Sequence, residues 1–527
     1  SIRRQPMREP LFLNWPEKSI LLNYLESTQA SVELTHQIEE LVIELCDSGD
    51  QLFNSFNSRI AYLYQKRKID KSLYHLLFSY RENFNDVDFH TYDSLNRMGV
   101  KALLELICKL KGSSIPQNLE VFTDYELKED LRILNGGQGS YRVSLHQLDS
   151  EKLYISLEAL GFQMLELPVN TIDPQYLEQI RKARDIAGFP IPAYVHQFEN
   201  VHGFWTFNHI VVFPDYLVDV TSIAECYSEN NSSPLKHFFN LFQARLATKY
   251  ILIGTTVNEF LDELILNPSL NYEQLYTAVF NKYPLPLSLL EDSDFKDYEK
   301  ATKDHFDNLQ KIVHSRFDGT YGKSDVVHLE PSFYSDIYGI QGRLDVLLET
   351  PGGVRKIIEL KSGKPFRADS NGINTNHKGQ AFLYDLLIQS VYKENRNNQC
   401  YILYSSQTNN SLRQSIPDVK SKKDLLMLRN SIVLLHYHLA FSNPCDNSFL
   451  DRVKMKMISS LDSFVRRDAE NWIKAFGELD ELEKKYFKHY TYFIAREQLI
   501  AKTGYSGLTQ TAGLASLWLF SREEKEL

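Results

Sequence analysis

Three residues suited to catalysis, Asp345, Glu359 and Lys361, stand close together in the second half of the chain. They lie in or directly beside two apolar segments, residues 340–348 and 354–360, which are joined by the turn formers Thr-Pro-Gly-Gly. This pattern predicts an antiparallel hairpin. Because side chains alternate between the two faces of a strand, we expect Glu359 and Lys361 to share a face that Asp345 reaches from the partner strand.

Two carboxylates and an ammonium group at one place have a definite chemical use. Neighbouring carboxylates repel each other, and one takes up a proton unless a cation lies between them. Hard oxygen ligands of this kind suit Mg²⁺ or Mn²⁺. A bound ion activates water and neutralises charge on a phosphate, and a nearby lysine stabilises the attacking group. The residues therefore predict phosphodiester hydrolysis.

The alternative is an ordinary hairpin whose Glu and Lys side chains form a cross-strand pair in solvent. The residues around Glu359 bear on this choice, because the segment reads Lys-Ile-Ile-Glu-Leu-Lys. Such an apolar segment favours a buried strand, in which unpaired charges are costly. The motif is short, so it needs further support from the neighbouring sequence.

That support comes from three motifs that follow one another in order. They are Gly-x-x-Gly-Arg-Leu-Asp ending at Asp345, Ile-Ile-Glu-Leu-Lys-Ser-Gly-Lys over residues 357–364, and His-Lys-Gly-Gln-Ala-Phe-Leu-Tyr over residues 377–384. Together they resemble the RecB-like branch of the PD-(D/E)XK nuclease superfamily. Within it, they are most similar to the nuclease part of replication-type ATP-dependent helicase–nucleases. The resemblance covers about residues 254–430.

The resemblance implies an α/β fold with a restriction-endonuclease-like core, in which a helix, a β-hairpin, a second helix and a strand follow in order. It implies that Asp345, Glu359 and the main-chain carbonyl of Leu360 bind Mg²⁺ or Mn²⁺. It also implies that Lys361 is catalytic.

The same resemblance places Gln380 and Tyr384, on the helix after the hairpin, beside the DNA. Arg343 precedes Asp345 by two residues and so shares its face of the strand. Its guanidinium group is placed either to contact a phosphate or to form a cross-strand salt bridge.

The main departure from the family pattern is Asn258. It lies in a predicted amphipathic helix that begins near Gly254 and ends at Asn267-Pro268. A metal-binding histidine commonly stands at this position in the RecB-like branch. An Asn carbonyl is an oxygen ligand that suits Mg²⁺ but is weaker for Mn²⁺ than imidazole. Asn258 is therefore a candidate metal ligand that leaves the metal preference open, and the alternative is a packed amphipathic helix.

The chain has 527 residues, which predicts several structural units. Helical periodicity is typical of residues 1–115, and alternating strands between turn formers indicate a β-rich domain over residues 116–235. The nuclease core is expected over residues 236–445. A helical C-terminal region is expected over residues 446–527.

Composition excludes several other classes of protein. The net charge of −10 argues against general coating of duplex DNA. No apolar run long enough for a membrane span or a signal peptide occurs, so a cytoplasmic location is expected. The five cysteines are too scattered to predict an iron–sulfur cluster. No Walker A motif occurs, so we expect no ATP site in this chain.

The sequence as a whole predicts a metal-dependent DNA nuclease that acts on single-stranded ends or flaps. The resemblance implies a helicase motor, either fused C-terminally in a longer protein or bound in trans. The alternative is a non-cleaving nucleic-acid-binding or docking module of a helicase or defence complex that keeps the nuclease fold. Asn258 favours that alternative, and the intact Asp–Glu–x–Lys set opposes it.

Overall fold

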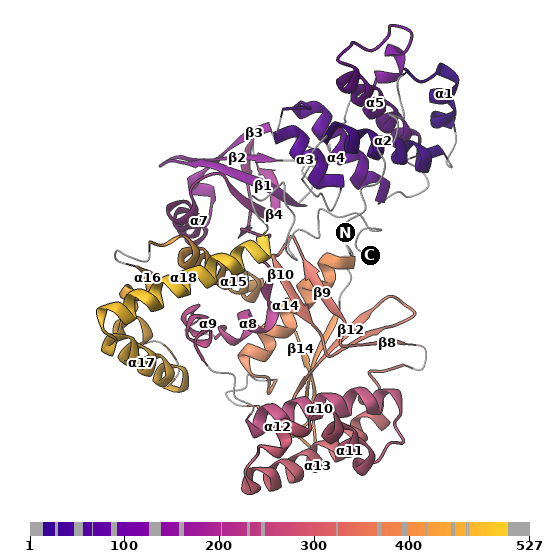
Figure 1. Ribbon diagram of the computed structural model, residues 1–527. Helices are drawn as coiled ribbons and strands as arrows, with labels where there is room; N and C mark the ends of the chain where they lie inside the picture. The colour runs from indigo at the N-terminus through magenta and orange to yellow at the C-terminus, as the bar shows by residue number, and fades with distance from the viewer. Residues whose placement is uncertain are drawn as a thin grey trace, which may run out of the picture. The chain divides into compact units, whose positions relative to one another are not determined.

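The fold is mixed α/β and divides into two compact units (Figure 1). The computed structural model describes residues 14–26, 30–46, 56–65, 67–85, 92–125, 139–157, 163–201, 203–228, 232–243, 248–322, 325–365, 371–392, 398–416, 419–443, 448–459, 461 and 463–503. The first unit comprises Ser1–Pro168, Phe198–Thr206 and Glu497–Leu527, and the second comprises Val169–Gln197 and Phe207–Arg496. No helix among the described residues is both long and apolar enough to cross a membrane.

The first unit begins with a group of helices. They are α1 (Lys18–Glu26), α2 (Ala30–Cys46), α3 (Phe56–Gln65), α4 (Lys71–Asn85), α5 (Tyr92–Lys111) and the 3-10 helix η1 (Glu120–Thr123). Apolar residues at helical spacing, such as Leu34, Ile38 and Leu41 in α2, form the buried core of this group. The N-terminal region is therefore helical, as predicted.

Strands follow within the segment that was predicted to be β-rich. The first unit holds β1 (Gly139–Leu148), β2 (Lys152–Leu157) and β3 (Gln163–Pro168), which pair antiparallel in that order. Strand β4 (Ile191–Val201) spans both units: its last residues pair with β5 (Phe204–Thr206), and its earlier residues pair with β6 (His209–Val212).

The second unit contains most of the helices. They are η3 (Val169–Thr171), α7 (Pro174–Ala187), α8 (Val220–Glu225), α9 (Leu235–Asn240), α10 (Lys249–Leu266), α11 (Tyr272–Lys282), α12 (Pro284–Ser288), α13 (Asp292–His314), α14 (Thr375–Tyr392), α15 (Val419–Phe441), α16 (Phe449–Arg452), η4 (Met455–Ile458), α17 (Ser463–Glu478) and α18 (Glu481–Thr503), whose last residues belong to the first unit.

The central sheet of the second unit has the strand order β14-β13-β12-β11-β8 among the described residues. Its strands are β8 (Val326–Leu329), β11 (Val346–Glu349), β12 (Arg355–Lys361), β13 (Gln399–Tyr404) and β14 (Leu412–Ser415). β12 runs antiparallel to β11 and parallel to β13. The parallel pair requires a crossover, which α14 supplies.

Helices cover both faces of this sheet. Ile358 and Leu360 of β12 join the buried core of α10 and α13, which Figure 1 shows in one helical layer with α11 and α12. Glu359 lies on the opposite face, where its side chain meets Gln380 of α14. The alternation of side chains along β12 thus places Ile358 and Leu360 toward one layer and Glu359 and Lys361 toward the other.

The predicted hairpin is correct for β11 and β12 but wrong for the first half of its first strand. Residues 340–343 form a separate strand, β10 (Ile340–Arg343), which pairs with β7 (Val218–Asp219) and β9 (Ser332–Ser335) in a second sheet. The chain bends at Asp345, between β10 and β11. Beside it, the chain also bends at Glu330, between β8 and β9. The φ of Glu330, 48°, is rare for a residue with a side chain.

A buried arginine holds this bent region against the rest of the unit. Arg429 of α15 donates hydrogen bonds to the carbonyl oxygens of Val212, Phe213, Tyr216 and Gly339, the last of which directly precedes β10. Burial lowers the pKa of Arg429 to about 9, so the guanidinium group is still charged at neutral pH. Four carbonyl dipoles take the place of the solvent from which this charge has been removed.

The C-terminal helices of the second unit pack around an aromatic cluster. The ring of Trp472 in α17 contacts those of Phe238 and Phe242 from α9 and the residues after it, and that of Phe487 in α18. The expectation of a helical C-terminal region is therefore confirmed for residues 463–503.

We expect Arg429→Met to lower the free energy of unfolding by about 4 kcal/mol or more, because several buried carbonyl groups lose a charged donor at once. Arg429→Lys should rescue little, since an ammonium group lacks the planar fork of donors. Urea unfolding of both variants measures the effect. Arg181→Met, at an exposed position of α7, is the control and should stay within about 0.5 kcal/mol of wild type. An Arg429→Met midpoint equal to the wild-type value would contradict the expectation.

Candidate active site

Asp345 is fixed by the main chain on both sides of it. Its Oδ2 accepts a hydrogen bond of 2.6 Å from the backbone N–H of Leu360 in β12. Its carbonyl oxygen accepts one of 2.9 Å from the N–H of Glu330. The pairing of β11 with β12 ends at Val346 and Ile358, so the Leu360 N–H has no backbone partner on β11. The Asp345 carboxylate accepts its hydrogen bond instead. The bend in the chain therefore brings Asp345 beside Glu359, as the sequence predicted.

Glu359, Lys361 and Gln380 form a closed triangle of hydrogen bonds. Lys361 Nζ donates to Glu359 Oε1 at 2.9 Å and to Gln380 Oε1 at 2.8 Å. Gln380 Nε2 donates to the same Glu359 oxygen at 2.7 Å. Because the amide group of Gln380 accepts from Lys361 and donates to Glu359, it fixes the positions of these two side chains together.

The second carboxylate oxygen of Glu359 takes no part in this triangle. Glu359 is buried, and its Oε2 has no hydrogen-bond partner in the part of the chain that the structure describes. An unpaired, buried carboxylate oxygen is costly and rare in folded proteins. It lies on the residue that, with Asp345, forms the predicted metal site, so the donor set fits a hard divalent cation.

The charges of the site are strongly coupled. Burial, and then the neighbouring Glu359, raise the pKa of Asp345 well above its usual value, although the Leu360 N–H opposes the shift. Burial by itself lowers the pKa of Lys361, but Glu359 and Asp345 outweigh it and raise that pKa above its usual value. Lys361 is therefore a cationic donor at neutral pH, while Asp345 ionises less readily than an ordinary carboxyl group.

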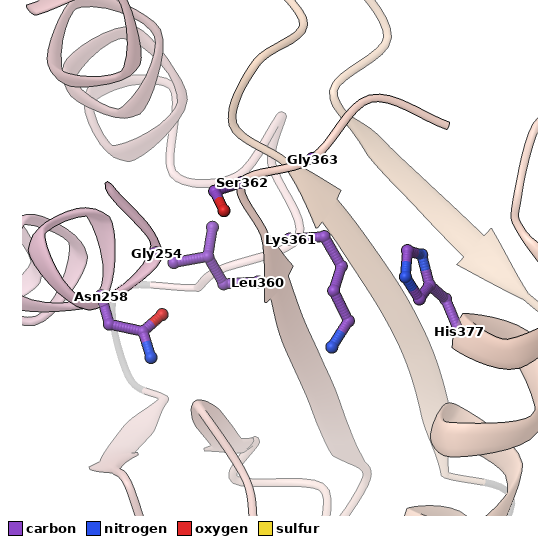
Figure 2. Close-up of a pocket in the computed structure, with 7 residues that line it drawn as sticks. All are labelled: Gly254, Asn258, Leu360, Lys361, Ser362, Gly363 and His377. Atoms are coloured by element: carbon purple, nitrogen blue, oxygen red, sulfur yellow. The ribbon is translucent and has the colours of Figure 1, made fainter. Parts of the chain in front are cut away.

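A pocket of about 280 Å³ opens at the end of β12. Its lining residues are Gly254, Asn258, Leu360, Lys361, Ser362, Gly363 and His377. Figure 2 shows Asn258 on α10 at one side, His377 at the start of α14 on the other, and Lys361 between them. The structure thus brings Asn258, Leu360 and Lys361 to one cavity, which is next to the two carboxylates.

Two residues near this site were not singled out by sequence reasoning. His377 lines the pocket, and its Nδ1 is 2.9 Å from the hydroxyl oxygen of Tyr404. Burial and then Lys361 lower the pKa of His377 to about 3, so the ring is neutral. His377 begins one of the quoted motifs, and that position was the available signal.

The second missed residue is Asp262, one helical turn after Asn258 in α10. Burial, followed by Glu330 and Glu259, raises the pKa of Asp262 to about 7. Asp262 in turn contributes to the raised pKa of Asp345. The spacing of four residues from Asn258 was the only sequence signal, because it places both side chains on one face of the helix.

Gln380 and Tyr384, which were predicted to lie beside DNA, make hydrogen bonds within the protein. Both are buried. The Tyr384 hydroxyl group donates to the carbonyl oxygen of Arg343 at 2.8 Å, and Gln380 belongs to the triangle described above. Their polar groups are thus bonded within the protein, and the amide of Gln380 holds Glu359 and Lys361 in place. The ring of Tyr384 also explains Gly342, where an added Cβ would lie 2.8 Å from a ring carbon.

Arg343 forms the salt bridge that was one of its two predicted roles. Its guanidinium group lies 3.3 Å from Glu330 Oε2, and its side chain is mostly exposed. Because an exposed pair of this kind is weak, it leaves the arginine accessible to a phosphate. Glu330 lies between β8 and β9, and its N–H donates to the Asp345 carbonyl oxygen, so it connects these two strands to the site.

No group of three or more His, Cys, Asp or Glu side chains with the geometry of a metal site occurs among the described residues. The candidate set here has two carboxylates, and its other ligands would be carbonyl or amide oxygens. Cys46, Cys226 and Cys400 are buried free thiols, and Cys445 lies outside the described residues. No protein-family model matches the chain, and comparison with curated proteins finds no match.

Asp345→Asn should stabilise the metal-free protein while changing one of the candidate metal ligands. Because the pKa of Asp345 is raised in the folded state, the wild-type protein loses stability as pH rises above the ordinary carboxyl pKa of 3.8. Asn keeps an oxygen for the Leu360 N–H but carries no charge. We expect the melting temperature to rise by about 2–4 °C at pH 8, which corresponds to ~1 kcal/mol in a domain of roughly this size.

The measurement is thermal unfolding in chelator at pH 5 and pH 8. The gain should be larger at pH 8, since the charge is more fully developed there. Asp304→Asn, at an exposed position of α13, is the matched control and should show no such dependence. A loss of stability in Asp345→Asn at pH 8 would mean that the carboxylate is favourable as it stands.

Proposed function

We propose that the protein is a metal-dependent nuclease that hydrolyses phosphodiester bonds. The observation that carries this proposal is the unpaired, buried Oε2 of Glu359 next to Asp345, whose pKa is raised. Structural carboxylates are normally paired, whereas this pair repels itself. Such an arrangement lowers stability and is typical of functional sites.

The ligands of the metal would be Asp345, Glu359 and the carbonyl oxygen of Leu360, with Asn258 as a further oxygen donor across the pocket. Mg²⁺ or Mn²⁺ bound there would lower the pKa of a bound water and neutralise charge on the phosphate. The remaining chemistry belongs to the side chains of the chain itself.

Lys361 acts as a donor rather than as a base, because its pKa is raised. Its Nζ donates two of its three hydrogens to Glu359 and Gln380, which leaves one to donate into the pocket. That hydrogen would stabilise the attacking oxygen or a phosphate oxygen. Arg343 at the exposed edge would bind a neighbouring phosphate.

The substrate and partner in this proposal rest on the order of the motifs. The resemblance to helicase–nucleases supports single-stranded DNA ends or flaps as substrate, and a helicase motor in a longer chain or in trans. The net charge of −10 agrees with a local contact and not with coating of a duplex. We propose a core of the restriction-endonuclease-like type, with α10, the β11–β12 hairpin, α14 and β13 as its elements.

The test is cleavage of end-labelled single-stranded and duplex DNA in Mg²⁺ or Mn²⁺. We expect metal-dependent cleavage by the wild type and a loss of at least ~100-fold in Lys361→Ala, since a group that touches the reacting phosphate is removed. Lys300→Ala, at an exposed position of α13, is the matched control. Binding without cleavage under both metals would favour the docking module instead and would point to Asn258 as the reason.

Gln380→Met should lower the cleavage rate by about 10–100-fold with little change in KM. The variant keeps the length of the side chain but releases Lys361 and Glu359 from their common partner. Tm and circular dichroism report whether the fold is retained. A rate equal to that of the wild type would show that Lys361 and Glu359 need no third residue to hold them.

A further inference from the structure

The outer face of α18 carries a row of exposed apolar and aromatic side chains. Leu482, Tyr486, Tyr490 and Phe493 recur at positions that share one side of a helix. Their exposed fractions are 76%, 70%, 54% and 55%. We call Tyr486, Tyr490 and Phe493 the α18 aromatic row. Single exposed apolar residues are ordinary, but a continuous row on one helix marks an interaction surface.

The rings of this row lie side by side in a regular manner. Tyr486 and Tyr490 have centroids 6.0 Å apart and planes that differ by 5°. Tyr490 and Phe493 follow at 6.3 Å and 30°. The opposite face of α18 is already used, since Phe487 contacts Trp472 and Tyr492 is buried. The helix is therefore anchored by one face and presents its aromatic row on the other.

The charges along one edge of the row are positive, while Glu483 and Glu497 lie beyond its two ends. From Lys484 to Arg496 the sequence contains four lysine or arginine residues and no carboxylate, in a chain whose net charge is −10. Lys488 is paired with Asp451 on the inner side. Lys485 and Arg496 are exposed, and helical spacing puts them along one edge of the aromatic row.

We propose that the α18 aromatic row binds single-stranded nucleic acid, with bases stacked on Tyr486, Tyr490 and Phe493 and phosphates paired with Lys485 and Arg496. Parallel exposed rings beside a basic edge are the combination that single-strand binding surfaces use. Every base has a π-face, so the surface is tolerant of sequence. Duplex DNA does not fit this surface, because its bases are already stacked on one another.

This inference rests on the proposed function. It adds a second contact for the single-stranded substrate, apart from the β12 pocket. The row lies in the second unit, which also holds the β12 pocket. A strand held at two places would be retained between cleavage events. Binding at the row itself needs no metal and no cleavage, so it can be measured separately.

The test is fluorescence anisotropy of labelled oligothymidylate in chelator, where no metal-dependent cleavage occurs. We expect Tyr486→Ser and Tyr490→Ser each to weaken binding about tenfold and to leave duplex binding unchanged. Lys485→Glu and Arg496→Glu should weaken binding and reduce the dependence on salt, by about 0.7 in the log–log slope for each phosphate that the variant no longer neutralises. Oligouridylate replaces oligothymidylate in a parallel series that compares RNA with DNA.

Matched controls are Phe204→Ser, an aromatic residue of similar exposure in β5, and Lys300→Glu in α13. Wild-type affinity in the row variants overturns the proposal, as does a wild type that binds no oligonucleotide at low salt. Loss of binding to anionic phospholipid vesicles in the same variants would assign the row to a membrane surface instead. A change in sedimentation would assign it to a second copy of the chain. In any of these outcomes, cleavage that depends on Lys361 would leave the proposed function intact.

Discussion

The repulsion between the carboxylates of the half-buried Asp345 and the buried Glu359 is the constraint that the second unit is built to hold. Left to themselves, these groups would separate or move into solvent. The N–H of Leu360 ties one of them, and the triangle with Lys361 and Gln380 ties one oxygen of the other. The packing of the helices and strands around the site preserves these hydrogen bonds, and so it keeps the two like-charged side chains close together.

The two layers of helices serve that purpose from opposite sides. α10 and α13 bury the apolar side of β12, and α14 meets its charged side with an amide group. The end of β12 is fixed again from α13, where His305 contacts Ser405, which donates its N–H to the Lys361 carbonyl oxygen. Farther away, Arg429 fixes the residue before β10 through its carbonyl oxygen. β12 is thus held by α10, α13 and α14, and the residue before β10 is held by α15.

Local patterns were sufficient to predict much of this arrangement. The β-branched and aliphatic residues over 354–360 and the helical spacing after Gly254 each predict one element, and the structure has both. The bend at Asp345 was missed, because the residues on both sides of it are equally good strand formers and the bend depends on a partner sheet far away in sequence. The burial of Tyr384 was missed for a related reason: helical spacing shows which residues share a face but not what that face meets.

The bend has a mechanical consequence. Asp345 is the junction between the sheet of β7, β10 and β9 and the sheet that contains Glu359. Any ligand that bridges the two carboxylates therefore fastens one sheet to the other, in addition to the backbone that already connects them. Binding of a ligand at the site and the association of the two sheets are therefore thermodynamically linked, so that each favours the other.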